Sequence, residues 1–586
     1  MTKNEILEKL NKLPKGGITT RKFKKANDKI YEYYYLQWTE EGKQKSIRIN
    51  DSELDIIKSQ LEERRKLEEL LNKGNFDDVS INLDFNTEVI IGDNLKQFSN
   101  SVNNLNKRYG YNKILDYIND NTLFNKVFVL YGLRRTGKTT LIKQIINNMN
   151  NRDLLKSAFI QITKKDTFSN FNKDLKLLQA YGYKYIFVDE ITFMEDFIEG
   201  ASLLSDIYAS SGIKIILSGT DSLGFWITKS NELYDRCIML HTTFIPYKEF
   251  SEVLGVKGID NYIQYGGTMS MSGNLYNSIF SDSSSTNEYI DSAIAQNIQH
   301  SLKHYQYEGH FRHLYDLYQN NELTGAINRV VEDINHRFTI DVLEKEFKSN
   351  DLRLSQNNLR KDRLNPTTVL DDIDINSFTN RLKELLEIKN KEERKIKIDD
   401  SIVKQIQEYL KALDMIDTID IKDIDNNNKG RIVFTQPGIR YSQAKSIIES
   451  LSNDVLFKNI SIEEQERIKN RILNEIKGRM TEDIILLETK IAMPYNNIFK
   501  LQFSDGEFDM VIQYLNTLEI EIFEIKYSKE IIKEQARHLI DENKCKEVEF
   551  KFGKIRKKTV LYRGENTILD GITYQNIEDY LSNLWK

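Results

Sequence analysis

The chain has 586 residues, of which 40% are hydrophobic and only five are proline, which excludes a disordered or proline-rich protein. At roughly 150 residues per domain, this length predicts about four domains. The net charge is −5, and two cysteines are too few for a disulfide framework or a cysteine-based zinc site.

The N-terminal stretch MTKNEILEKLNKLPK lacks the apolar core of a signal peptide. No run approaches the about 18 apolar residues that a membrane span needs. Together with the absence of a disulfide framework, this predicts a cytoplasmic protein without membrane contact.

The first 50 residues are basic, with 12 lysines or arginines against six acidic residues. Residues 30–49 are typical of a hairpin, with an aromatic strand, a Glu-Glu-Gly turn and a basic strand. Basic residues interleaved with aromatic ones can bind nucleic acid, although an ordinary small β domain fits the same pattern. A helix is expected over 52–73, and the segment 74–98, which lacks a helical period, is expected to connect two domains.

The strongest motif is a phosphate-binding loop. Residues 132–139, GLRRTGKT, match G-x-x-x-x-G-K-[ST] between an apolar strand at 127–130 and a helix that follows. Lys138 is expected to reach the β- and γ-phosphates of ATP, and the Thr139 hydroxyl is expected to join the Mg²⁺ shell. The other expected nucleotide contacts are Gly132, Arg135, Thr136, Gly137 and Thr140.

Two carboxylates end a second apolar run at 185–188. Carboxylates at the end of a buried strand are unfavourable unless they are used. Asp189 fits the acid on the Mg²⁺ side, and Glu190 fits the residue that polarises the attacking water. A simple Asp-Glu pair that opens a loop is the alternative.

Further strands are expected at 158–162 and 213–217. The second strand leads into Ser218 and Thr220, and either side chain could sense the γ-phosphate. An intervening strand and a glutamate beside the aspartate are typical of ATPases with an inserted strand rather than of GTPases or small-molecule kinases. The predicted fold is a parallel sheet with flanking helices.

These motifs resemble the prokaryotic AAA-type P-loop ATPases that carry a C-terminal PD-(D/E)xK restriction-endonuclease-like domain. The resemblance implies that Arg236 contacts nucleotide or signals its state, in cis or in trans, although Asp235 replaces the usual preceding glycine. The segments that carry the resemblance are GLRRTGKTTLIKQ (132–144), YIFVDEIT (185–192), IILSGTDS (215–222) and 233–250, with Leu233, Arg236, Pro246, Glu249 and Phe250 at family positions.

The middle of the chain reads as helices, followed at 401–421 by a helix that runs into a strand. Amphipathic helices are expected at 322–335 and 377–388. This order suits a winged-helix-like region, a common companion of such ATPases that often touches DNA. An inert helical connector fits equally well.

The tail holds Glu482 near the start of an expected helix at 478–488, Asp509 on a strand, Glu524 and Lys526 on a second strand, and Gln535 on a helix at 530–540. This order resembles the PD-(D/E)xK nuclease core, with Phe508 in place of the usual proline. The resemblance implies that Asp509 and Glu524 hold Mg²⁺ with support from Glu482. Lys526 would orient the attacking water, and Gln535 would position the lysine or the phosphate.

Four domains are therefore expected: a basic β module at 1–75, an ATPase at 76–255, a helical and winged-helix-like region at 256–430, and a nuclease-like domain at 431–586. The expected function is an ATP-hydrolysing switch coupled to Mg²⁺-dependent DNA cleavage, with DNA preferred over RNA. A setting in antiviral defence or mobile-element biology, and a homo-oligomer, are compatible by analogy. The alternative is an ATP-dependent protein that binds DNA or a partner without cutting; a metabolic kinase fits less well.

Overall fold

The computed structural model divides the chain into two compact units, Met1–Asp84 and Phe85–Lys586. None of the described helices combines the length and apolar character that a membrane span requires. The helix expected at 377–388 lies outside the described residues. The described residues are 3–24, 30–40, 43–73, 84–194, 196–220, 233, 235–269, 282–304, 311–348, 399–425, 428–450 and 461–585.

The first unit consists of two helices and a three-stranded antiparallel sheet in the order β1-β2-β3. The helices pack on each other through Ile6, Leu10 and Leu67. The expected aromatic and basic strands and the helix after them are confirmed, and β1 adds a strand that the sequence analysis missed. The elements are α1 (Lys3–Lys12), β1 (Gly17–Lys24), β2 (Ile30–Glu40), β3 (Lys43–Ile49) and α2 (Leu54–Lys73).

The second unit begins with a six-stranded sheet in the order β4-β6-β7-β8-β5-β9. All strands except β4 run parallel, which confirms the expected parallel sheet. Strand β8 lies between β5 and β7, so the strands of the two motifs are separated by an inserted strand. The strands are β4 (Glu88–Ile91), β5 (Val127–Tyr131), β6 (Ser157–Gln161), β7 (Tyr185–Asp189), β8 (Lys214–Gly219) and β9 (Cys237–His241).

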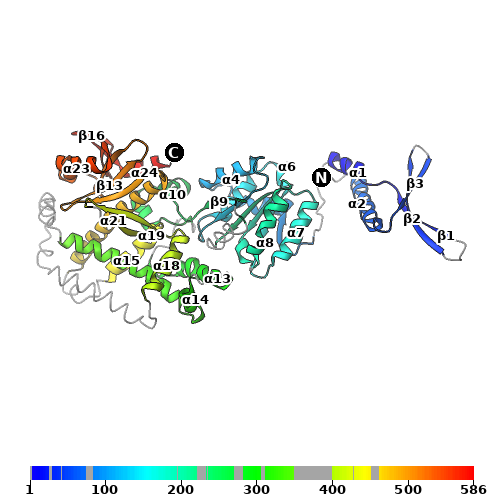
Figure 1. Cartoon of the computed structure of the whole chain (residues 1–586), viewed down its shortest axis with the longest axis horizontal. Coiled ribbons are helices and arrows are strands. Elements are labelled where there is room, and N and C mark those ends of the chain that lie inside the picture. Colours follow the sequence, from blue (N-terminus) through cyan, green and yellow to red (C-terminus); the bar gives the residue numbers. More distant parts are fainter. Residues whose placement is uncertain are drawn as a thin grey trace. The chain divides into compact units, whose positions relative to one another are not determined.

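Helices cover both faces of this sheet (Figure 1). Side chains alternate along β5, so Val127 and Val129 join one core while Phe128 and Leu130 join the other. The expected connector at 74–98 is wrong in part, because the short apolar run EVII pairs with β6 as an edge strand and a helix follows it. The flanking helices are α3 (Gly92–Asn100), α4 (Gly110–Asn119), α5 (Lys138–Asn147), α6 (Asn151–Leu154), α7 (Phe168–Ala180), α8 (Phe197–Leu203) and the π-helical η2 (Leu204–Ala209).

A run of helices follows β9, as expected for the middle of the chain. Helices α14, α15 and α18 share one core with η3 and the start of β10. The Pro-Gly pair at 437–438 lies inside the first turn of α19. The helices are α10 (Tyr247–Leu254), α11 (Ile259–Tyr265), α12 (Ser283–Ile290), η3 (Asp291–Ala295), α13 (Gln296–His304), α14 (Arg312–Gln319), α15 (Leu323–Lys348), α18 (Asp400–Ala412) and α19 (Pro437–Ser450).

An eight-stranded mixed sheet, ordered β11-β10-β12-β13-β14-β15-β17-β16, fills the C-terminal part. The boundary expected after residue 430 falls inside β11, because the β10–β11 hairpin continues this sheet through a parallel pairing of β10 with β12. The strands are β10 (Ile416–Asp423), β11 (Asn428–Phe434), β12 (Asn497–Gln502), β13 (Glu507–Tyr514), β14 (Glu519–Ile525), β15 (Lys554–Tyr562), β16 (Thr567–Leu569) and β17 (Ile572–Asn576).

Two helix expectations for the tail need correction. Helix α21 (Ile462–Ala492) is far longer than 478–488, so Glu482 lies in its second half rather than near its start. The expected helix at 530–540 is instead a 3₁₀ turn, η6 (Lys533–Ala536), and one helical turn, α22 (Arg537–Ile540). The tail is completed by α23 (Glu542–Phe552) and α24 (Ile577–Leu584), and α10 and α11 share a core with α21 and α24.

Candidate functional site

The phosphate-binding loop joins β5 to α5 through a sharply folded backbone. Gly132 and Gly137 have positive φ angles of 144° and 87°, and Arg135 has a φ of 64°. A Cβ atom at Gly132 would lie 2.5 Å from Thr242 Oγ1, so glycine is required for the close approach to the end of β9. The loop therefore presents backbone N–H groups at the start of a helix, the geometry that receives phosphate oxygens.

Lys138 points back into the loop. Its Nζ donates hydrogen bonds of 2.8 Å to the carbonyl oxygens of Gly132 and Leu133. Burial lowers the pKa of Lys138 to about 8. Thr136 is also buried and donates to the Leu133 carbonyl at 2.8 Å, while Thr140 is half-buried on the first turn of α5. Lys138 and Thr136 therefore stabilise the folded loop.

An oxygen-rich cluster lies beside the loop. Thr139 Oγ1 donates to Asp189 Oδ2 at 2.7 Å, which joins the two sequence motifs directly. The Ser218 hydroxyl donates to the other oxygen of Asp189. Hydroxyl and carboxylate oxygens are the ligands that Mg²⁺ prefers, so Thr139 and Asp189 fit this ion.

Glu190 is held by the other candidate sensor. Its backbone is left-handed, with φ of 56°, and its Oε2 accepts from the Thr220 amide at 3.2 Å and from Thr220 Oγ1 at 3.1 Å. Burial raises the pKa of Glu190. The structure thus separates the two sensor candidates, with Ser218 on Asp189 and Thr220 on Glu190.

Two residues that the sequence analysis missed support this site. Asn297 on α13 donates to the Thr220 carbonyl at 2.6 Å. Arg108 is buried and forms a two-point ion pair with Glu249, with Nε and Nη2 each 2.8 Å from a carboxylate oxygen. Arg108 also donates to the Thr136 carbonyl in the phosphate loop. Glu249 was among the family positions, and this was the only signal in the sequence for the ion pair with Arg108.

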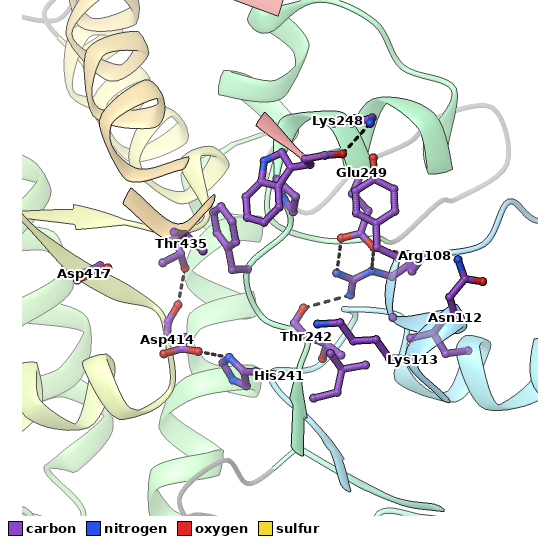
Figure 2. Close-up of a pocket in the computed structure, with 18 of the residues that line it drawn as sticks. Arg108, Asn112, Lys113, His241, Thr242, Lys248, Glu249, Asp414, Asp417 and Thr435 are labelled. Atoms are coloured by element: carbon purple, nitrogen blue, oxygen red, sulfur yellow. Dashed lines mark hydrogen bonds and ion pairs between the residues drawn. The ribbon is translucent and has the colours of Figure 1, made fainter. Parts of the chain in front are cut away.

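A pocket of about 820 Å³ adjoins Arg108, as Figure 2 shows. It lies between α4, β9 and α10 on one side and α18, β10 and Trp585 on the other. His241 contacts Asp414 across it, and Lys248 Nζ donates to the Trp585 carbonyl at 2.8 Å. The pocket therefore joins the phosphate-loop region to the C-terminal sheet.

A family match covers the part of the chain that holds this geometry. A protein-family model described as an AAA domain matches residues 124–251, which contain the loop, Asp189, Glu190 and β9. The chain contains an AAA domain of the P-loop ATPase type. No curated protein matches the chain.

Solved structures resemble the chain only distantly. A Saccharomyces cerevisiae Hsp104–casein complex shares 15% identity over 28% of this chain and 32% of that chain, with a TM-score of 0.22. The Hsp104–ADP complex shares 13% identity over 69% and 62%, with a TM-score of 0.26. Aeropyrum pernix ORC1 in complex with DNA shares 10% over 62% and 98%, with a TM-score of 0.22. The chain thus spans about a third of one Hsp104 chain and somewhat under two thirds of the other.

Arg236 lies away from the phosphate loop of its own AAA domain. It directly precedes β9, and its carbonyl accepts from Val127 at the start of β5, whereas the loop follows the end of β5. Because β5 and β9 are parallel, Arg236 lies at the N-terminal ends of the strands, whereas the phosphate loop lies at their C-terminal ends. Its side chain pairs with Asp206 at 3.0 Å. The structure therefore does not bring Arg236 to the nucleotide site of its own chain.

The AAA domain is followed by a second charged cluster at the expected nuclease-like positions. Lys526 Nζ lies 3.0 Å from Asp509 Oδ2 and 2.7 Å from Glu524 Oε2. Both carboxylates are buried, and the Ile525 amide donates to Asp509 Oδ2 at 2.8 Å. Although burial opposes it, the ammonium groups of Lys526 and Lys500 lower the pKa of Asp509, while burial raises that of Glu524.

Lys500 on β12 completes this cluster and was also missed. Its fully buried Nζ lies 3.0 Å from Glu482, 2.7 Å from Glu507 and 3.3 Å from Asp509. Glu482 also accepts from Arg479 one turn earlier on α21. The structure therefore brings Glu482 to the cluster through a lysine, and Glu507 joins it as an unexpected member.

The remaining expectations for this cluster have different outcomes. Gln535 accepts a 3.3 Å hydrogen bond from Ser528 and has no hydrogen bond to Lys526 or Asp509. Among the described residues, no group of three or more His, Cys, Asp or Glu side chains has the geometry of a metal site. Glu524 Oε1 is nevertheless buried without a hydrogen-bond partner, so one acceptor in the cluster is unused.

Proposed function

We propose that the AAA domain binds ATP with Mg²⁺ and hydrolyses it. The observation that carries this proposal is the pair of contacts Thr139–Asp189 and Glu190–Thr220, which set a hydroxyl–carboxylate pair and a buried carboxylate beside one phosphate loop. A bound Mg²⁺ would neutralise charge on the β- and γ-phosphates.

The residues divide this chemistry among them. Lys138, with the N–H groups of Gly132, Arg135, Thr136 and Gly137, would exchange its carbonyl contacts for phosphate oxygens. Thr139 and Asp189 would hold the ion, with Thr140 next to them on α5. Glu190 would leave Thr220, accept a proton from the attacking water and orient it toward the γ-phosphorus. Thr220 would then be released to contact the γ-phosphate.

Two substitutions test these roles separately. Glu190→Gln should abolish ATP turnover while ATP binding persists, because the acceptor for the water proton is lost and the loop is intact. Lys138→Ala should lose binding as well as turnover. Steady-state hydrolysis and equilibrium binding of a fluorescent ATP analogue measure both. Turnover above a tenth of the wild-type rate in Glu190→Gln would contradict the assignment of the base.

We further propose that the C-terminal domain binds DNA and cleaves it with Mg²⁺. The supporting observation is the buried, unpartnered Oε1 of Glu524 beside Asp509 and Lys526. Asp509 and Glu524 would hold the ion, which supplies an activated water and charge neutralisation on the phosphodiester. Lys526 would orient that water, Glu482 would support the ion, and Gln535 would approach the phosphate.

A specific observation also favours the alternative of a domain that binds DNA without cutting it. Lys500 places an ammonium among Glu482, Glu507 and Asp509, where it balances the carboxylates in the absence of a metal. In this second candidate function, the cluster stabilises the domain and the ATP state controls DNA or partner binding. The two candidates differ in whether Mg²⁺ produces nicks.

We propose that the two sites communicate through α11. Asp260 of α11 accepts a hydrogen bond from Tyr527, which directly follows Lys526. It accepts a second one, of 3.2 Å, from Lys477 on α21. It also accepts from Arg563. Movement of α11 with the nucleotide state would therefore reach the residue next to Lys526. A homo-oligomer in which Arg236 acts in trans, a winged-helix-like role of α14, α15 and α18, and a setting in genome defence belong to the same proposal.

The coupling is tested by incubating supercoiled and linear DNA with Mg²⁺, with and without ATP. Nicking that is lost in both Asp509→Ala and Lys138→Ala identifies a nucleotide-gated nuclease. Nicking lost only in Asp509→Ala separates the two activities. ATP turnover with DNA binding and without nicks supports the non-cutting alternative.

A further inference from the structure

The sheet of the N-terminal unit has two different faces. Leu36 and Ile49 are buried at 9% and 3% exposure and lie on one face, because side chains alternate along a strand and paired residues share a face. Lys22 and Glu32 pair at 2.7 Å on that same face. This face, which we call the inner face, therefore holds the two buried residues and an exposed ion pair.

The opposite face carries arginine and tyrosine. Tyr35 pairs with Arg48 on β3, and Tyr33 pairs with Arg21 on β1, so all four residues point to this side. Both arginines are exposed and both tyrosines are half-buried. Among the strand residues whose side chains the structure describes, Glu32 is the one carboxylate, and it lies on the inner face. We name the outer surface of Arg21, Tyr33, Tyr35 and Arg48 the Arg–Tyr face.

Each arginine lies over a tyrosine ring across the diagonal. The guanidinium carbon of Arg21 lies 4.7 Å from the centre of the Tyr35 ring, and that of Arg48 lies 3.9 Å from the Tyr33 ring. A guanidinium that lies over a ring can still donate hydrogen bonds from its N–H groups. The contact with the ring also reduces the conformational freedom that the arginine would lose on binding. Two guanidinium groups on a face where the described side chains include no carboxylate match phosphate oxygens or the acceptor edge of guanine.

The same arrangement favours double-stranded over single-stranded nucleic acid. Single-strand binding relies on bases that stack on exposed aromatic faces, but here arginines cover one face of each ring. The DNA major groove, about 12 Å wide, admits a β-ribbon whose strands lie about 5 Å apart. The first 50 residues also carry twice as many basic as acidic residues, which suits a polyanion. We propose that the Arg–Tyr face binds double-stranded DNA through its major groove and flanking phosphates.

This inference is independent of ATP hydrolysis and of cleavage, so it is tested on the full chain without nucleotide. Fluorescence anisotropy with a labelled 30-base-pair duplex gives Kd for the wild type and for the double variant Arg21→Ala, Arg48→Ala. The expected result is a Kd at least about tenfold higher, since the double variant loses both arginine contacts. The matched control, Lys22→Ala with Lys58→Ala, removes two exposed positive charges outside the face and should change Kd less than about twofold.

A charge-preserving variant, Arg21→Lys with Arg48→Lys, keeps the sheet charged and should recover less than half of the lost binding free energy, because lysine lacks the planar fork. Circular dichroism and unchanged ATP turnover verify that the variants fold. Equal losses in the face variant and the control, or tighter binding to the single strand than to the duplex, would overturn the proposal. Unchanged binding in the face variant would also overturn it, because the DNA contact would then lie elsewhere in the chain. Lys138→Ala, which should lose ATP turnover, should bind DNA as tightly as the wild type.

Discussion

Asn297 on α13 holds the carbonyl of Thr220 with a 2.6 Å hydrogen bond, while Thr220 holds the carboxylate of Glu190. The helical region after the AAA sheet thereby contacts the ATPase site through one buried side chain. The Asn297 amide donates to Thr220 rather than to the phosphate loop or Asp189, so we expect its effect to be separable from nucleotide binding.

Substitution of Asn297 should therefore change turnover more than affinity. Asn297→Ala is expected to lower kcat about fivefold, the factor that corresponds to about 1 kcal/mol for one hydrogen bond, with the Kd for ATP unchanged. Asn328→Ala is the control, because it removes an asparagine hydrogen bond to Asp291 in the same helical region without touching Thr220. A parallel loss of kcat in both variants would show that Asn297 acts only through general stability.

The buried ion pair between Arg108 and Glu249 predicts strong non-additivity. Arg108→Met or Glu249→Gln alone leaves an uncompensated buried partner and should cost about 3–5 kcal/mol of stability. The double variant should lose clearly less than the sum of the single losses. Thermal unfolding of the four proteins measures the cycle, and purely additive losses would contradict a direct pairing.

The contact between α10 and α21 predicts a pH dependence. Glu488 accepts from the Tyr247 amide at 2.7 Å and from Trp585 Nε1 at 3.0 Å, and burial raises its pKa from 4.5 to about 7. Between these pH values the folded state keeps a proton that the unfolded chain releases, so the Glu488 contribution to stability falls as the pH rises through the window. Glu488→Gln lacks this proton exchange. Its melting temperature relative to wild type should rise from pH 5 to pH 8, and a difference that stays constant would contradict the assignment.

Lys500 predicts a link between Mg²⁺ and stability. Lys500→Met leaves Glu482, Glu507 and Asp509 without their shared ammonium and should lower the melting temperature. Mg²⁺ should restore part of this loss by binding the carboxylates and should stabilise the variant more than the wild type. Lys526→Met removes the same charge but leaves Lys500 in place, so it should respond less. Equal responses to Mg²⁺ in all three proteins would contradict a cation-binding cluster at Lys500.

Much of the ATPase site is predictable because its residues are local in sequence. The phosphate loop, Asp189 and Glu190 each follow an apolar strand, and parallel strand ends meet at one edge of a sheet. Thr220 and Ser218 were both found, but only the three-dimensional structure assigns each to its carboxylate.

The missed residues share a different property. Arg108, Asn297 and Lys500 have no motif around them, and their partners lie on other elements. For Arg236 the sequence left a role in cis or in trans open, because a family position specifies a place in the sequence and not the end of the sheet at which the residue lies. Gln535 was placed on a helix that is only a turn, because the apolar spacing of 530–540 fits both forms over so short a stretch.

The parallel pairing of β10 with β12 has a practical consequence for dissecting the chain. A C-terminal fragment that begins at residue 431 would lose β10 and the first three residues of β11. The edge of β12 would then be exposed, with backbone groups free to pair with another strand. Such a fragment should self-associate whatever its catalytic state. A C-terminal fragment that is to remain monomeric has to begin upstream of α18, so that it contains β10, which pairs with the edge of β12.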